Sequence, residues 1–243
     1  MQKGVRGPKM ILDSIKQSIK QTPYFECEDG LLYCADCMDI LPQLPEGCVD
    51  LCLSDPPYGI DWDTNYSRFS RGTADKAPIE NDTGPFDPAP LLGFPEVILF
   101  GGNHFADKLP PASWLIWDKR NADGTSFLAD GEAAWWNKGR GIYIKSFSGQ
   151  YHRSTAGGFH PTQKPVVIME WCLEKSKSTG IVLDPYAGSC TTAVACRRLN
   201  RQWICIEIDE GYCRIAKDRI QAEQKGISVK ELKQGQGVLF EKA

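Results

Sequence analysis

Residues 181–192 read Ile-Val-Leu-Asp-Pro-Tyr-Ala-Gly-Ser-Cys-Thr-Thr, an apolar run that leads through a turn into a helix. The run ends at Asp184, and the small residues 187–189 form the turn. Backbone amides at a strand-to-helix turn, with the helix N-terminus behind them, can hold a negatively charged or polar cofactor group. The stretch therefore predicts an α/β fold with a cofactor site at the end of a strand.

Strand-like runs recur on both sides of this stretch, with helical stretches between them, which is the pattern of an α/β sheet. The predicted strands cover residues 31–34, 49–54, 97–100, 114–117, 142–147, 181–183 and 203–208. The predicted helices cover residues 166–177, 191–199 and 210–224.

An acidic residue, Glu207, follows the next apolar run, where it is placed to accept hydrogen bonds from ribose hydroxyls. The turn is not a dinucleotide fingerprint, because no G-x-G-x-x-G is present. It is not a P-loop either, because the Gly-Lys-Ser/Thr ending is missing. A single adenosine-containing cofactor fits the pattern better than either.

A second polar motif, Asp55-Pro56-Pro57-Tyr58, follows the apolar run at 49–54. It offers a carboxylate that accepts from an amino group, a backbone stiffened by two prolines, and an aromatic face for stacking. These groups suit chemistry on the exocyclic amine of a nucleobase. Taken alone, the motif is also compatible with a proline-stiffened turn that carries a surface tyrosine.

A third motif, His160-Pro-Thr-Gln-Lys-Pro165, precedes the predicted helix at 166–177. Proline suits the start of a helix. Thr162 and Lys164 could hold a carboxylate at this entry by hydrogen bond and charge.

Composition places the chain among ordinary globular proteins, with 243 residues, 42% hydrophobic and 24% charged. No run has the length of a membrane span, and residues 1–20 lack the apolar stretch of a signal peptide, so a cytoplasmic protein is expected. Cys52, Cys172, Cys196 and Cys205 lie in apolar runs and are expected to be small buried hydrophobes. The C-x-x-C at 34–37 has no second pair, so no metal site is expected.

The net charge of −3 argues against wholesale wrapping of nucleic acid, but the charge is unevenly distributed. Residues 136–165 contain no Asp or Glu and mix cations with aromatic residues. Such a segment suits phosphate neutralisation and base contact, although a solvated loop with scattered charge would look the same.

The three motifs together resemble the DNA amino-methyltransferases, and the order, catalytic motif first and cofactor motif last, is that of the circularly permuted beta group. The resemblance includes Asp36-Cys37 after the strand at 31–34 and spans about residues 31–220. Compact phage and prophage adenine methylases share the runs at 100–105 and 117–120. The resemblance implies a Rossmann-like fold that depends on S-adenosylmethionine, with a mixed, mostly parallel sheet and helices on both faces.

The resemblance also assigns roles. Asp55 and the Pro56 carbonyl would accept from the target amine, beside Pro57, and Tyr58 would stack on the extruded base. The cofactor would be bound by Asp36, Cys37, Thr162, Lys164, Asp184, Ala187, Gly188, Ser189 and Glu207. Cys190 and Cys205 stand where the family usually has glycine, which implies a slightly tighter pocket.

The expected reaction is methyl transfer from S-adenosylmethionine to the N6 amine of a flipped-out adenine in double-stranded DNA, because an Asp at the first motif position is typical of adenine enzymes. Cytosine N4 is the alternative. A protein-glutamine methyltransferase or an inactive DNA-binding homologue fits less well. Neither a metal nor a membrane is expected. A homodimer is compatible with the sequence, and no nuclease motif is visible.

One methyltransferase domain is expected over residues 1–243. It would carry a peripheral arm at 1–24 with a short helix at 11–20, a lid loop at 60–95, a small target-recognition region at 118–159 and a loose tail at 225–243. The candidate DNA contacts are Arg68, Arg71, Lys119, Arg120, Lys138, Arg140, Lys145 and Arg153.

Overall fold

The computed structural model describes residues 8–59, 84–125, 129–148 and 163–240. Within these residues, nine strands form one sheet in the order β1-β2-β9-β8-β3-β4-β6-β5-β7. The strands are β1 (Phe25–Cys27), β2 (Gly30–Cys34), β3 (Leu51–Ser54), β4 (Glu96–Phe100), β5 (Ser113–Asp118), β6 (Gly131–Trp136), β7 (Ile142–Ser146), β8 (Val182–Asp184) and β9 (Trp203–Glu207).

The sheet is mixed and mostly parallel, as predicted. The run from β2 through β9, β8 and β3 to β4 is parallel throughout. Antiparallel pairs occur only towards the two sides of the described sheet, where β1 pairs with β2 and β6 pairs with both β4 and β5. The last strand, β7, runs parallel to β5.

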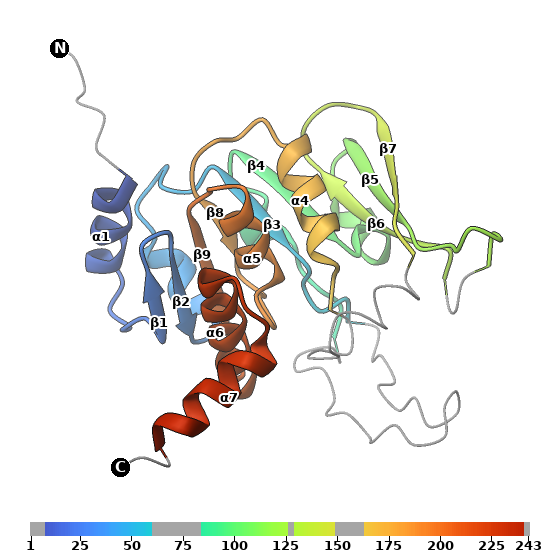
Figure 1. Cartoon of the computed structure of the whole chain (residues 1–243). Coiled ribbons are helices and arrows are strands. Elements are labelled where there is room, and N and C mark those ends of the chain that lie inside the picture. The colour runs from blue at the N-terminus through green and yellow to red at the C-terminus, as the bar shows by residue number, and fades with distance from the viewer. Residues whose placement is uncertain (1–7, 60–83, 126–128, 149–162, 241–243) are drawn as a thin grey trace.

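Helices cover both faces of the sheet (Figure 1). On one face α4 (Val166–Lys175), α5 (Thr191–Arg198) and α6 (Glu210–Lys225) pack on a core that includes Leu32 and Leu53. On the other face α1 (Pro8–Ser18) and the short α2 (Cys37–Ile40) pack against Leu31 and Tyr33. Side chains of consecutive strand residues point to opposite faces, and this is why neighbours such as Leu31 and Leu32 enter different cores.

The central strands read as continuous apolar runs because they are buried on both faces. Cys52, Cys172, Cys196 and Cys205 are each 0% exposed, as expected for small buried hydrophobes. In the part of the chain that the structure describes, no helix is both long and apolar enough to cross a membrane.

Both ends of the described chain are more ordered than the sequence suggested. Helix α1, expected at 11–20, begins at Pro8 and buries Ile15 in the core beside β2. The segment 225–243, expected to be a loose tail, contains α7 (Val229–Phe240). Ser228 Oγ and Glu231 form a reciprocal capping box at the start of this helix, a Ser-x-x-Glu signal present in the sequence.

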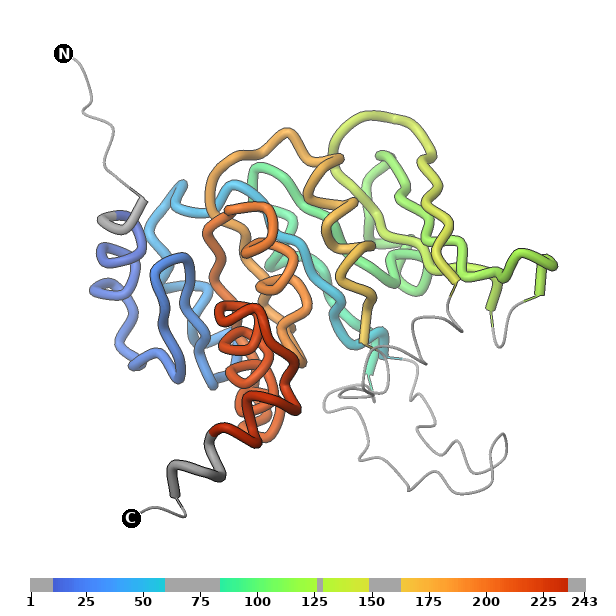
Figure 2. Tube along the Cα trace, in the orientation of Figure 1, coloured from blue at the N-terminus to red at the C-terminus, as the bar shows by residue number. Residues whose placement is uncertain are grey.

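The parallel strands bring segments from the two ends of the chain together (Figure 2). Strand β2, near the start of the chain, pairs with β9, near the end of the chain. In the same way, β3 pairs with β8. Because β2, β9, β8, β3 and β4 are parallel, their carboxyl ends meet at one edge of the sheet. We call this edge the site edge, since ligands of open α/β sheets bind outside the carboxyl ends of the strands.

Candidate active site

The motif at residues 55–58 lies at the site edge, directly after β3. Two consecutive prolines cannot donate to a sheet ladder, so the strand ends at Ser54. Ser54 Oγ donates to Asp184 Oδ1 over 2.6 Å, across 130 positions of sequence. This bond joins the end of the predicted catalytic strand to the end of the predicted cofactor strand.

Asp184 is 3% exposed and its carboxylate is engaged inside the protein. Besides Ser54, it accepts from Thr192 Oγ1 at 2.5 Å and from the Tyr186 backbone N–H at 3.2 Å. Burial raises its pKa to about 6, and the hydrogen bonds oppose that shift. Asp184 therefore fixes the turn between β8 and α5 relative to β3.

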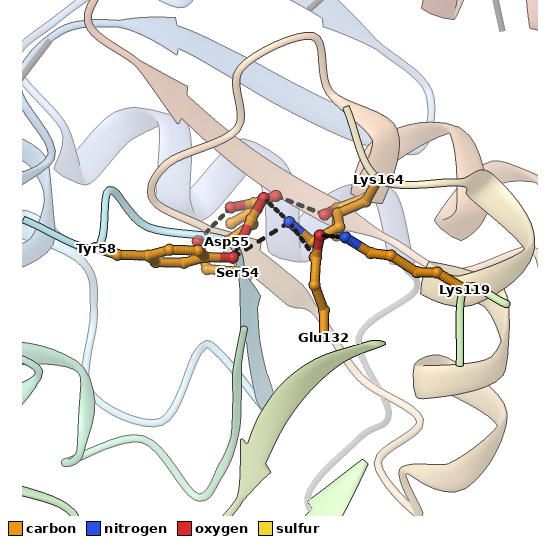
Figure 3. Close-up of polar contacts among 8 residues, drawn as sticks. Ser54, Asp55, Tyr58, Lys119, Glu132 and Lys164 are labelled. Carbon is orange, nitrogen blue, oxygen red and sulfur yellow. Dashed lines mark hydrogen bonds and ion pairs between the residues drawn. The ribbon is translucent and has the colours of Figure 1, made fainter. Parts of the chain in front are cut away.

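Asp55 presents both carboxylate oxygens to other side chains (Figure 3). Tyr58 Oη donates to Oδ1 over 2.6 Å, and the Lys164 ammonium contacts Oδ2. Burial raises the pKa of Asp55, and the positive charge of Lys164 is the main influence in the opposite direction. The Asp55 side chain retains 21% exposure, so it remains within reach of a ligand.

Lys164 is the centre of a group of four charged side chains that we call the charge cluster: Asp55, Glu132, Lys119 and Lys164 (Figure 3). Its ammonium lies 2.9 Å from Glu132 Oε2 and 3.3 Å from Tyr58 Oη, and its side chain is 5% exposed. Glu132 Oε1 in turn contacts Lys119. The two carboxylates raise the pKa of Lys164 well above its usual value, against the effect of burial.

The ring of Tyr58 is held from two sides. His104 stacks on it with ring centroids 5.0 Å apart and planes 16° apart. Gly101 adopts φ +70, and a Cβ built on it would lie 2.0 Å from Tyr58 Cε1. Position 101 must therefore be glycine for both conformation and space. His104 thus contacts the predicted stacking residue.

Replacing Gly101 with alanine should displace the Tyr58 ring and weaken its bond to Asp55. The left-handed backbone alone costs an alanine about 1–2 kcal/mol, and the clash adds to that. Denaturant unfolding measures the loss. Gly93→Ala is the matched control, because Gly93 is exposed and, beyond its chain neighbours, no atom of the described residues lies within 4 Å of its built Cβ. Equal stability losses in the two variants would contradict the proposed constraint on Tyr58.

The predicted cofactor turn is organised by Glu207 at the end of β9. Its carboxylate accepts from the Gly188 N–H at 2.6 Å and from the Asp209 N–H at 2.9 Å. Burial raises its pKa, and these amide bonds oppose the rise. Each carboxylate oxygen has further lone pairs, so Glu207 could also accept from hydroxyl groups of a ligand. Asp36, exposed after β2, caps α2 by accepting from the Met38 N–H at the same edge.

Cys190 and Cys205, the two positions where glycine was expected, lie together in the core. Cys190 has φ 56 and ψ 46, the left-handed conformation that glycine adopts at little cost. Its side chain hydrogen-bonds with that of Cys205. Both thiols are 0% exposed, so the two side chains fill adjacent space in the core.

Arg219 on α6 supports the same turn and was not identified from the sequence. Its guanidinium donates to the Ser189 carbonyl, to Ser189 Oγ at 2.7 Å and to Thr191 Oγ1 at 3.2 Å. It is 8% exposed, and burial lowers its pKa to about 10. The available signal was a charged residue inside the apolar stripe of Cys213, Ala216 and Ile220.

Comparison with known proteins agrees with this geometry. The sequence profile of the N6/N4 family described as DNA methylase matches residues 114–218. Over these residues the chain is similar to the DNA methylase family. The type II methyltransferase M.ScaI of Streptomyces caespitosus is 26% identical over 89% of both chains. The predicted recognition is thereby confirmed at the level of a DNA amino-methyltransferase.

Solved structures show the same fold. The match to the PvuII cytosine-N4-specific DNA methyltransferase covers 89% of this chain and 94% of that enzyme, with TM-score 0.57 and 15% identity. The match to TTHA0409, a putative DNA modification methylase from Thermus thermophilus in complex with S-adenosyl-L-methionine, covers 79% of this chain and 93% of that protein, with TM-score 0.50 and 20% identity. The predicted methyltransferase fold is confirmed. The circular permutation and the phage origin stay predictions.

The fold does not bring all the candidate DNA contacts together. Strand β6 is antiparallel to β4 and carries the chain from Glu132 at the site edge to the opposite edge. The exposed Lys138 and Arg140 follow β6 and therefore lie away from Asp55. Strand β5 is antiparallel to β6 and ends at the site edge, so Lys119 and Arg120, which follow β5, lie at that edge.

The candidate DNA-contacting residues at the site edge are Lys119, Arg120 and Lys145, and each has different neighbours. Lys119 is part of the charge cluster, and Arg120 pairs with Asp118 at 2.9 Å. Lys145 lies on β7 opposite Trp117. A cavity of about 520 Å³ between these strand ends is lined by Asp118, Arg120, Asn121, Ala122, Gly124, Ser146, Phe147 and Ser148. It belongs to the described part of the predicted target-recognition region.

Four predicted site residues, Arg68, Arg71, Arg153 and Thr162, lie outside the described residues, as do parts of the predicted lid and recognition region. Cys37 is 6% exposed and its side chain hydrogen-bonds with Tyr186. Among the residues that the structure describes, no group of three or more His, Cys, Asp or Glu could hold a metal ion.

Proposed function

We propose that this methylase transfers a methyl group from S-adenosylmethionine to the N6 amine of an adenine extruded from double-stranded DNA. One observation carries the proposal: a partly exposed carboxylate, Asp55, stands beside an aromatic ring at the carboxyl end of β3. This strand end is tied by the Ser54–Asp184 bond to the turn that would hold the methyl donor. An acceptor, a stacking surface and a cofactor turn thus meet at one edge of the sheet.

The site fits S-adenosylmethionine by the chemistry of its groups. Glu207 would accept from the ribose hydroxyls, and the exposed Asp36 lies at the adjacent strand end. Ile208 and Met38, 43% and 49% exposed, offer apolar surface for an adenine ring. The S-adenosylmethionine complex of TTHA0409, which has the same fold, supports this cofactor.

Lys164 was expected to bind the methionine end of the cofactor, but its ammonium forms ion pairs with Asp55 and Glu132. The turn at 187–189 would line that part of the site, and Arg219 holds it in a fixed conformation.

The bound cofactor supplies an electrophilic methyl group. The protein must make the amine nucleophilic, because the lone pair of an exocyclic amine is delocalised into the ring. Asp55 and the Pro56 carbonyl would accept hydrogen bonds from its two N–H groups and localise that lone pair. Most of the acceleration then comes from positioning and fixed charge. Tyr58 would stack on the extruded base and offset part of the unstacking cost of a few kcal/mol.

Adenine is favoured over cytosine because the motif begins with Asp, whereas the cytosine-N4 enzymes of the family more often begin with Ser. The PvuII enzyme, which has the same fold, is cytosine-N4-specific, and cytosine N4 is therefore the second candidate. The protein-glutamine and inactive alternatives are weaker. The groups that an active site needs surround Asp55, and the family match is to DNA methylases.

The choice of base is tested with duplexes that offer adenine or cytosine in one strand only, treated with the methylase and tritium-methyl S-adenosylmethionine. We expect label only in the adenine-containing strand, released as N6-methyladenine after hydrolysis. Label recovered as N4-methylcytosine would replace the adenine assignment with its alternative. Absence of transfer to either duplex and to genomic DNA would overturn the enzymatic proposal.

A DNA substrate has consequences for the target sequence, the cellular compartment and the partners of this protein. The small recognition region at 118–159 suggests a short or relaxed target sequence, which sequencing of methylated sites would reveal. A bacterial or phage-infected cytoplasm is the compartment where such a substrate is found. A homodimer and an enzyme without a dedicated nuclease are the remaining expectations.

A further inference from the structure

Glu132 is a half-buried charged residue that belongs to none of the three sequence motifs. It lies on β6, the strand that runs antiparallel to β4 and leaves the site edge at this residue. Its Oε2 is 2.9 Å from the Lys164 ammonium, and its Oε1 contacts Lys119. Its contacts therefore connect the target-recognition region to the catalytic motif.

Two carboxylates share the Lys164 ammonium, one from Asp55 and one from Glu132 (Figure 3). With Lys119 included, the charge cluster contains two positive and two negative groups. A buried ammonium is strongly disfavoured without a carboxylate partner. Lys164, at 5% exposure, therefore needs at least one of its two partners at every stage of the reaction.

The proposed reaction withdraws one of them. When Asp55 accepts from the target amine, the oxygen that now contacts Lys164 must be shared or released, because the amine and the ammonium both donate to it. Glu132 comes from a different strand, β6, and its Oε2 can retain the ammonium. Lys119 neutralises the other Glu132 oxygen, so the cluster stays balanced in charge.

We propose that Glu132 is a positioning residue that holds the Lys164 ammonium while Asp55 engages the target amine. This inference rests on the proposed methyl transfer, and it adds a residue from β6 to the catalytic arrangement. Without Glu132, Lys164 would pair with Asp55 alone and compete with the amine for the same carboxylate.

The pH dependence of the reaction gives a specific signature. The groups that face Asp55 are Lys164, Tyr58 and Glu132, and Asp184 lies at the adjacent strand end. The negative charge of Glu132 raises the pKa of Asp55, whereas Lys164 lowers it. Removal of the Glu132 charge should therefore lower the pKa of Asp55 and move the acid limb of the rate profile to lower pH.

The experiment compares wild type, Glu132→Gln and Glu132→Asp in single-turnover transfer at saturating cofactor and DNA. We expect Glu132→Gln to slow transfer by about 100-fold, a loss typical of misplaced catalytic groups. Its acid limb should lie at lower pH, its cofactor affinity should be unchanged, and Glu132→Asp should restore part of the rate. Glu223→Gln is the matched control, because Glu223 also pairs with a cation and is 28% exposed against 26% for Glu132.

A readout without turnover separates this inference from the proposed function. The Asp55 carboxyl carbon is titrated by NMR in wild type and in Glu132→Gln. A lower pKa in the variant supports the inference even if wild type were to transfer no methyl group, an outcome that would refute only the proposed function. An unchanged Asp55 titration, or an active wild type matched in rate and pH profile by Glu132→Gln, would overturn the role of Glu132.

Discussion

Replacing Asp55 with asparagine is expected to slow methyl transfer by about 100- to 1,000-fold, the range found when one charge-stabilising group is removed from an active site. Asparagine preserves the shape of the side chain, but its amide nitrogen is a donor and cannot accept a hydrogen bond from the target amine. It also leaves Lys164 with Glu132 as its carboxylate partner in the charge cluster. Single-turnover transfer onto the preferred duplex measures the loss, and calorimetry should show unchanged cofactor affinity.

Asp50→Asn is the control for this variant. Asp50 precedes the same strand at its other end, where its carboxylate accepts from the Ile181 N–H at 2.9 Å, and it is exposed. An asparagine there keeps an acceptor oxygen, so transfer should remain close to that of wild type. Transfer by Asp55→Asn at the level of the control would show that Asp55 does not organise the amine.

Replacing Lys164 with methionine should have the largest effect on stability. It would leave the partly buried carboxylates of Asp55 and Glu132 without their shared cation. Removal of one partner from a buried ion pair costs about 3–5 kcal/mol because the remaining charge is uncompensated. Denaturant unfolding near neutral pH measures this loss. Lys177→Met, at an exposed position just after α4, should be close to wild type.

The pH dependence of this loss has a definite sign. In wild type the pKa of Glu132 is lowered, so its stabilising contribution is present above the usual value of 4.5 and is lost as pH falls through the folded value. The pKa of Lys164 is raised, so its contribution is present below 10.5 and is lost as pH rises through its folded value. Without Lys164, the two carboxylates bind protons more readily. The deficit of Lys164→Met should therefore shrink from pH 7 towards pH 4. A deficit that grows with acid would contradict the role of Lys164 as their cation.

Local patterns were sufficient for most of the fold. The strands from β2 to β9 that read as continuous apolar runs were predicted within one or two residues, because burial on both faces imposes that composition. Two strands were missed. β1 has only three residues, and β6 begins with Gly-Glu-Ala-Ala, which has little β propensity. Because β6 was missed, residues from 136 onward were predicted as one basic segment, and Glu132 received no role.

Turn chemistry and the residues at strand ends are local properties, so the predicted catalytic and cofactor motifs could be identified from the sequence. Which side chains meet depends on the tertiary fold. It placed Lys164 on Asp55 and Glu132, Arg219 on Ser189, and Lys138 and Arg140 at the edge away from the site. The physical reason is that contacts between remote segments depend on strand order and direction. One antiparallel strand, β6, carries residues only a few positions apart to opposite edges of the sheet, and no local pattern specifies its neighbours.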